Sequence, residues 1–135
     1  MSQEKLSLKG LNFQATKIEE NKNILTITLN RPEKKNALNN VMVNEICYAL
    51  AYAKQERSVR VIIIAAEGDI FCAGADLRRE ESESNVPKIE GADDISLMLR
   101  HLYKPVICKI QGSVLAGALS VSYTHLRAHE TRPNL

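Results

Sequence analysis

Two short segments rich in Gly and Ala have residue types that suit the binding of an oxygen anion by the main chain. The first elbow is residues 71–77 (FCAGADL), and the second elbow is residues 111–117 (QGSVLAG). Small side chains let a ligand approach the backbone closely. If a helix begins at each elbow, its first N–H groups are unpaired and carry partial positive charge. Two such N–H groups aimed at one point would form an oxyanion hole.

Strands must position these elbows, because each elbow follows a short apolar run. β-branched residues and short length predict buried parallel strands for the runs that precede the elbows. Apolar residues alternate regularly with polar ones over residues 24–29, which predicts a further strand. The alternation over residues 11–19 is irregular, which predicts an edge strand before it. The four predicted strands are residues 11–19, 24–29, 59–66 and 105–110.

Helical spacing of apolar residues predicts a helix over residues 40–55, with Asn39 or Asn40 as its cap. A second helix is predicted over 95–103. A third is predicted to begin at Asp76, and the polar stretch 84–94 between these two is predicted to be a mobile loop. Strands that alternate with helices in this way predict an α/β fold with right-handed crossovers.

Composition narrows the class of protein. The chain has 135 residues, of which 44% are hydrophobic and 25% charged, which is typical of one globular domain. The net charge of +2 and the 4% aromatic content, without Trp, argue against a nucleic-acid partner. The sequence has no long apolar stretch that would indicate a signal peptide or a membrane span. We therefore expect a cytoplasmic protein with no membrane partner.

The cysteines are odd in number and widely spaced, which favours free thiols in a reducing compartment. They are Cys47, Cys72 and Cys108. Cys72 lies in the first elbow, but no basic residue near it in the sequence would activate it as a nucleophile.

Two other motifs are incomplete. Gly112 and Gly117 have the spacing of a phosphate-binding P-loop, but residues 118–119 are Ala and Leu instead of Lys and Ser or Thr. His125 and His129 lie one helical turn apart without an evident third ligand, so no metal site is predicted.

Three ordered blocks resemble the enoyl-CoA hydratase/isomerase (crotonase) family. They are residues 27–38 (ITLNRPEKKNAL), residues 71–77, and residues 104–107 (KPVI) with the glycines of 112–117. The resemblance covers roughly residues 11–119 and corresponds to the N-terminal half or so of family members, which are usually much longer.

The resemblance implies a ββα spiral core, truncated here, and acyl-CoA thioester substrates of the kind used in fatty acid metabolism. It implies that the N–H groups of Ala75 and Gly117 bind the thioester oxygen. Coenzyme A would be part of the substrate, so no separate cofactor is expected, and family members commonly assemble as trimers or hexamers. The residues expected to line the CoA channel are Lys35, Ala37, Leu38, Ala73, Gly74, Asp76 and Leu77. From its sequence context alone, Asp76 could be catalytic, but an Asp after a Gly-Ala turn is more often a helix cap.

Departures from the family pattern leave the reaction open. Ser120 stands where the hydratases carry a catalytic Glu, and their second catalytic Glu lies beyond Leu135. A hydroxyl is a poor general base at neutral pH. Hydration, isomerisation, decarboxylation and dehalogenation all stay possible within this fold. The alternative is a catalytically silent module for acyl-CoA binding or oligomerisation.

The chain divides into two parts at residue 120. We expect residues 1–120 to be the N-terminal part of a crotonase-like domain. Residues 121–135 are polar where an apolar helix should continue, and they resemble translated sequencing-adaptor sequence, so we expect a non-native tail. On this interpretation the 135-residue chain alone is inactive and unstable, because its sheet lacks cover.

Overall fold

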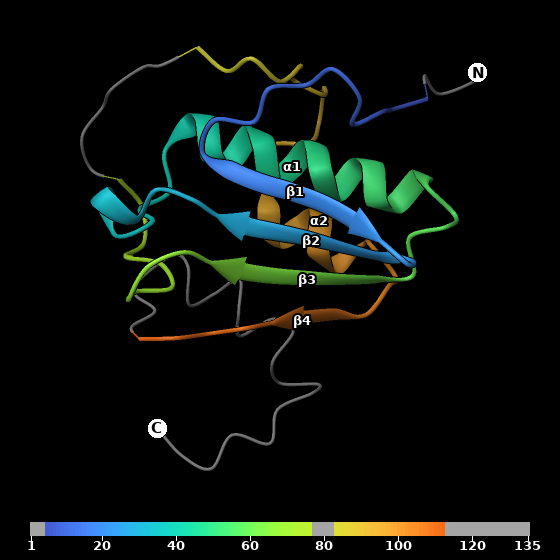
Figure 1. Ribbon diagram of the computed structural model, residues 1–135. Coiled ribbons are helices and arrows are strands. Elements are labelled where there is room, and N and C mark those ends of the chain that lie inside the picture. Colours follow the sequence, from blue (N-terminus) through green and yellow to red (C-terminus); the bar gives the residue numbers. More distant parts are fainter. Residues whose placement is uncertain (1–4, 77–82, 113–135) are drawn as a thin grey trace.

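The described part of the chain forms a four-stranded sheet with two α-helices on one of its faces, and a short 3-10 helix (Pro32–Lys34) follows β2 (Figure 1). The computed structural model describes residues 5–76 and 83–112. Strand order is β1-β2-β3-β4, with β1 antiparallel to β2 and the other neighbours parallel. The strands are β1 (Thr16–Asn21), β2 (Ile24–Leu29), β3 (Val61–Ala66) and β4 (Val106–Cys108). The predicted α/β class and the predicted edge position of the first strand are confirmed.

One face of the sheet is buried and the other is partly open. Leu25 and Ile27 of β2 are fully buried, as is Ile62 of β3, which pairs with Leu25. Side chains alternate between the faces of a strand, so the next residues point the opposite way. Ile63 pairs with Ile107 on that second face, and Ile107 is 48% exposed. The core therefore lies between the sheet and the two helices.

Helix α1 (Asn40–Gln55) has the predicted bounds, and so has strand β2. The Asn39 side chain accepts a hydrogen bond of 2.9 Å from the Met42 N–H, which is the expected cap. The Lys104 ammonium donates to two carbonyls at the other end of α1. Side chains thus satisfy some of the unpaired backbone groups at both ends of the helix.

Three predicted elements other than β1 are longer than the observed ones. Strand β4 covers only Val106–Cys108 of the predicted residues 105–110. Helix α2 (Ile95–Arg100) ends before residue 103, because Tyr103 has a φ of +58°, outside the helical region. Strand β3 begins at Val61 instead of residue 59. Of the helix predicted to begin at Asp76, residues 77–82 lie outside the described part of the chain, as does the predicted tail 121–135.

The stretch 84–94 has no helix or strand, as predicted, and it contacts α1. The Asn44 side chain donates hydrogen bonds to the Ser84 hydroxyl (3.0 Å) and to the Val86 carbonyl (2.8 Å). Val86 is only 3% exposed. The predicted mobility of this loop stays a prediction.

Glu45 of α1 is fully buried and fixes the chain just before β1. Its carboxylate accepts hydrogen bonds from the Gln14 N–H (2.7 Å), the Ala15 N–H (3.0 Å) and the Thr16 hydroxyl (2.8 Å). A buried carboxylate needs such partners to offset its lost hydration. Because Glu45 takes these N–H groups, β1 begins at Thr16 and not at the predicted residue 11.

The substitution Glu45→Gln is expected to lower the free energy of unfolding by about 2 kcal/mol, since an amide has one acceptor oxygen where the carboxylate uses two. Urea unfolding of the two proteins measures this difference. Glu33→Gln is the matched control, because Glu33 is exposed, and it should change stability by no more than about 0.5 kcal/mol. Equal effects of the two substitutions would contradict the role given to Glu45.

Candidate active site

The first elbow and the loop after β2 lie next to each other at one edge of the sheet (Figure 1). This edge is formed by the carboxyl ends of the parallel strands β2, β3 and β4. The loop 30–39 follows β2, the first elbow follows β3, and the second elbow follows β4. Ligands of open α/β sheets bind outside the carboxyl ends of the strands. The topology therefore delivers the described part of the first elbow, and Gln111 and Gly112 at the start of the second, to the edge where a ligand is expected.

Backbone hydrogen bonds join the loop after β2 to the first elbow. The Ala73 N–H donates to the Lys35 carbonyl at 3.0 Å. The Leu38 N–H donates to the Gly74 carbonyl at 2.7 Å, and the Asp76 N–H donates to the Leu38 carbonyl at 2.8 Å. The structure thus brings together the predicted site residues of both segments, with Ala37 and Ala75 between them. Leu77 and Gly117 lie outside the described residues.

The Ala75 amide points away from this ladder. Leu38 and Ala75 form a parallel bridge. In a planar trans peptide the Gly74 C=O and the Ala75 N–H point in opposite directions. Because the Gly74 carbonyl faces Leu38, the Ala75 N–H faces the other way. Ala75 is exposed, and nothing in residues 5–76 and 83–112 accepts a hydrogen bond from its N–H.

Asn36 sets the spacing between the loop and the elbow. It is fully buried and has a φ of +55°. Its side-chain amide donates to the carbonyls of Glu67 (2.8 Å) and Ile70 (2.9 Å), and its oxygen accepts from the Arg31 N–H (2.8 Å). No individual role was predicted for Asn36 from the sequence. The available signal was its residue type, because Asn tolerates the left-handed region better than most residues.

The substitution Asn36→Asp is expected to cost about 3 kcal/mol or more of stability, since carboxylate oxygens would face the two carbonyls that now accept hydrogen bonds. Thermal or urea unfolding measures the cost. Asn39→Asp is the matched control, because Asp keeps the acceptor that caps α1, and it should be nearly neutral. A nearly neutral Asn36→Asp would contradict the account of this network.

Cys72 is a structural thiol in this arrangement. It is 1% exposed, donates to the Asn36 carbonyl at 3.1 Å and accepts from the Gly74 N–H at 3.4 Å. Burial raises the pKa of the Cys72 thiol, and the Gly74 N–H offsets only part of that rise. The group stays protonated at neutral pH, so it is not poised as a nucleophile.

The start of the second elbow contacts the turn that leads into the first elbow. The Phe71 N–H donates to the Gln111 carbonyl at 3.0 Å. The Gln111 side chain donates to the carbonyls of Ala66 (2.6 Å) and Gly68 (2.9 Å). Gly112 has a φ of +65° and also touches this turn. Gln111 thereby links the carboxyl ends of β3 and β4, a role that was not predicted from the sequence.

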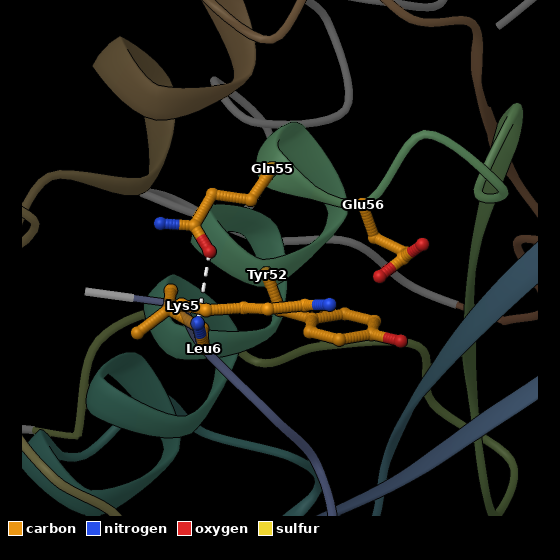
Figure 2. A pocket seen from close by; sticks show the side chains of 5 residues that line it. All are labelled: Lys5, Leu6, Tyr52, Gln55 and Glu56. Carbon is orange, nitrogen blue, oxygen red and sulfur yellow. Dashed lines mark hydrogen bonds between the residues drawn. The ribbon is translucent and has the colours of Figure 1, made fainter. Parts of the chain in front are cut away.

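A pocket of about 280 Å³ lies elsewhere, at the far end of α1 (Figure 2). The N-terminal segment covers the last turn of the helix there, and the Leu6 N–H donates to the Gln55 side chain at 2.9 Å. Its lining residues are Lys5, Leu6, Tyr52, Gln55 and Glu56. The 16 residues of α1 span about 24 Å, so this pocket is remote from Ala75.

Residues 5–76 and 83–112 contain no evident metal site, because no three side chains of His, Cys, Asp or Glu come together there. No helix in the same ranges combines the length and the apolar character needed to cross a bilayer.

The sheet topology and the exposed Ala75 amide define an α/β protein with a candidate backbone anion site at the carboxyl ends of its strands. Residues 19–124 match the family described as enoyl-CoA hydratase/isomerase. The match spans most of the 135-residue chain, and the chain belongs to this family.

Individual relatives carry the names of different enzymes. A probable enoyl-CoA hydratase of Mycobacterium bovis is 34% identical over 112 residues, which is 73% of this chain and 38% of the relative. A trans-2-decenoyl-[acyl-carrier-protein] isomerase of Streptococcus mutans is 33% identical over 106 residues, covering 73% of this chain and 40% of the relative. The chain thus spans about two fifths of the length of these curated relatives.

Solved structures confirm the expected crotonase-type fold. A crystal structure of an enoyl-CoA hydratase from Mycobacterium smegmatis superposes with a TM-score of 0.70 at 28% identity. The superposition covers 83% of this chain and 46% of that structure.

Proposed function

We propose that this chain is the N-terminal part of an enzyme that binds an acyl-CoA and stabilises negative charge on its thioester oxygen. Residues 1–120 would contribute the oxyanion site, with the N–H groups of Ala75 and Gly117 as its two donors. The observation that carries the proposal is the Ala75 N–H, which the Leu38–Ala75 bridge turns outward at an exposed position.

Physical chemistry supports a backbone donor at this place. Charge that develops on a thioester oxygen needs donors that are fixed before the reaction, so that no reorganisation is required in the transition state. The bonds from Leu38 to Gly74 and from Asp76 to Leu38 hold both peptide groups that flank Ala75. Membership of the enoyl-CoA hydratase/isomerase family supports Gly117 as the second donor.

The CoA portion of the substrate would run along the loop after β2 and the first elbow. Lys35 has an exposed side chain there, and Ala37 and Leu38 are half-buried beside it. The remaining residues of the proposed channel are Ala73, Gly74, Asp76 and Leu77. Coenzyme A enters and leaves with the substrate, so no resident cofactor is proposed.

The reaction itself is proposed only as a class, enoyl-CoA hydration or isomerisation. Ser120 replaces the expected general base, and this favours one alternative, a silent module that binds acyl-CoA or supports oligomerisation. We also propose a cytoplasmic homotrimer or hexamer for the whole protein, which its mass in solution would test.

Turnover and binding assays on the whole protein separate the two functions. A set of enoyl-CoA substrates of different chain length would be tested for hydration and for double-bond migration, and binding would be measured with saturated acyl-CoAs. Turnover of at least one substrate supports the enzyme. Binding without any turnover supports the silent module, and the absence of both would refute the acyl-CoA proposal.

A further inference from the structure

We propose that Arg31 is a positioning residue that strengthens the Ala75 N–H as a hydrogen-bond donor through a relay of two peptide groups. This inference rests on the proposed function, because it assigns Arg31 to the same oxyanion site. Arg31 itself would touch neither substrate nor reacting atoms. It would act through Ala37, Leu38 and Gly74 on the amide that does.

The Arg31 guanidinium holds both sides of the Leu38–Ala75 bridge. Its Nη1 donates to the Ala37 carbonyl at 2.5 Å, and its Nη2 lies 3.3 Å from Oδ2 of Asp76. Only 11% of the Arg31 side chain and 7% of the Asp76 side chain are exposed. A planar guanidinium can bind two acceptors at fixed angles, which a flexible ammonium cannot. Arg31 therefore fixes the residues that flank the bridge.

The relay follows from the planarity of the peptide bond. The Ala37 C=O and the Leu38 N–H belong to one trans peptide and point in opposite directions. The guanidinium binds the first group, and the second donates to the Gly74 carbonyl at 2.7 Å. The Gly74 C=O and the Ala75 N–H form the next trans peptide. The Ala75 N–H is thus the last group in a series of hydrogen-bonded peptide groups that begins at the Arg31 guanidinium.

The orientation of the hydrogen bonds in this series increases the donor strength of the Ala75 N–H. A cation that binds a carbonyl draws electron density through the peptide and makes its N–H a stronger donor, and hydrogen bonds in a chain polarise one another in this way. The Asp76 carboxylate offsets the through-space charge of Arg31. The effect of Arg31 on bound substrate would therefore travel through the hydrogen bonds and the geometry they fix.

The test uses the whole protein with butanoyl-CoA, isotope-labelled at the thioester carbonyl, as a probe that has no double bond to hydrate. Hydrogen bonds to that carbonyl lower its stretching frequency in the infrared spectrum. Arg31→Gln is expected to reduce this downshift by about a third. It is also expected to lower kcat on an enoyl-CoA substrate about tenfold while KM changes little, because the donor is weakened and not removed.

Lys104→Met is the matched control, because it also removes a cation that donates to two backbone carbonyls. These are the carbonyls of Ala53 and Glu56, at the end of α1 remote from the elbow. The control should leave the downshift unchanged and kcat within about twofold of the parent protein. A loss of downshift as large as that of Arg31→Gln would overturn the relay.

Arg31→Lys keeps the test decisive if Arg31→Gln does not fold. It retains a cation beside Asp76 but cannot hold Asp76 and the Ala37 carbonyl together at fixed angles. We expect a smaller loss of downshift and of kcat than for Arg31→Gln. A folded Arg31 variant, Gln or Lys, with parental downshift and kcat would overturn the relay alone. No downshift in the parent protein would instead overturn the proposed oxyanion site.

Discussion

Replacement of Ala75 by Pro is expected to lower kcat of the whole protein by about 10²- to 10³-fold, the usual effect of removing one oxyanion donor. Proline removes the N–H of residue 75 and nothing else from the ladder, because the bridge to Leu38 uses the Gly74 carbonyl and the Asp76 N–H. Proline is tolerated where a strand N–H faces away from its neighbour. Steady-state kinetics on an enoyl-CoA substrate measure the effect.

Ala75→Gly is the control for this substitution, because it removes the methyl group and keeps the N–H. Its kcat should stay within a factor of about ten of the parent value, and circular dichroism should show that both variants fold. An Ala75→Pro variant that folds and turns over substrate at the rate of the parent protein would show that the amide is not a donor.

The substitution Gly112→Ala is expected to cost about 3 kcal/mol or more of stability, because strain and overlap combine at this position. A Cβ on Gly112 would lie 1.9 Å from the carbonyl oxygen of Asp69 and 3.2 Å from the Cα of Ile70. Both are backbone atoms, so the turn before the first elbow or the start of the second elbow must move. The same movement would separate the two elbows, and kcat should fall with stability.

Gly91→Ala isolates the steric part of this prediction. Gly91 has a φ of +80°, and a Cβ there would meet nothing within 4 Å. It should therefore cost only the left-handed strain of about 1–2 kcal/mol and leave kcat unchanged. Urea unfolding compares the two variants. Equal losses of stability would show that the contact between Gly112 and Asp69 does not hold the elbows together.

Local sequence patterns were enough to predict much of the fold. Strand β2 and helix α1 have the predicted bounds because regular periodicity and an Asn cap determine them locally. The predicted start of β1 was wrong because the Glu45 side chain, about thirty residues further along the chain, accepts the hydrogen bonds of the Gln14 and Ala15 N–H groups. Contacts between distant residues override local preference in such places.

Sequence patterns indicated where the first elbow lies but not which side chains support it. Gly and Ala after a buried strand indicated an approachable backbone at the first elbow, and the structure places Ala75 there with its amide turned outward. Arg31, Asn36 and Gln111 were missed. Asn36 and Gln111 donate to backbone carbonyls far along the chain, and Arg31 pairs with the distant Asp76 carboxylate. No spacing in the sequence signals those partners.

The central claim is that two backbone amides converge on one thioester oxygen. A crystal structure of the whole protein with butanoyl-CoA tests it most directly, through the distances from that oxygen to the nitrogens of Ala75 and Gly117. The account predicts that both distances lie at about 2.7–3.1 Å. An oxygen bound by neither nitrogen, or two nitrogens that face different sides of the molecule, would contradict it.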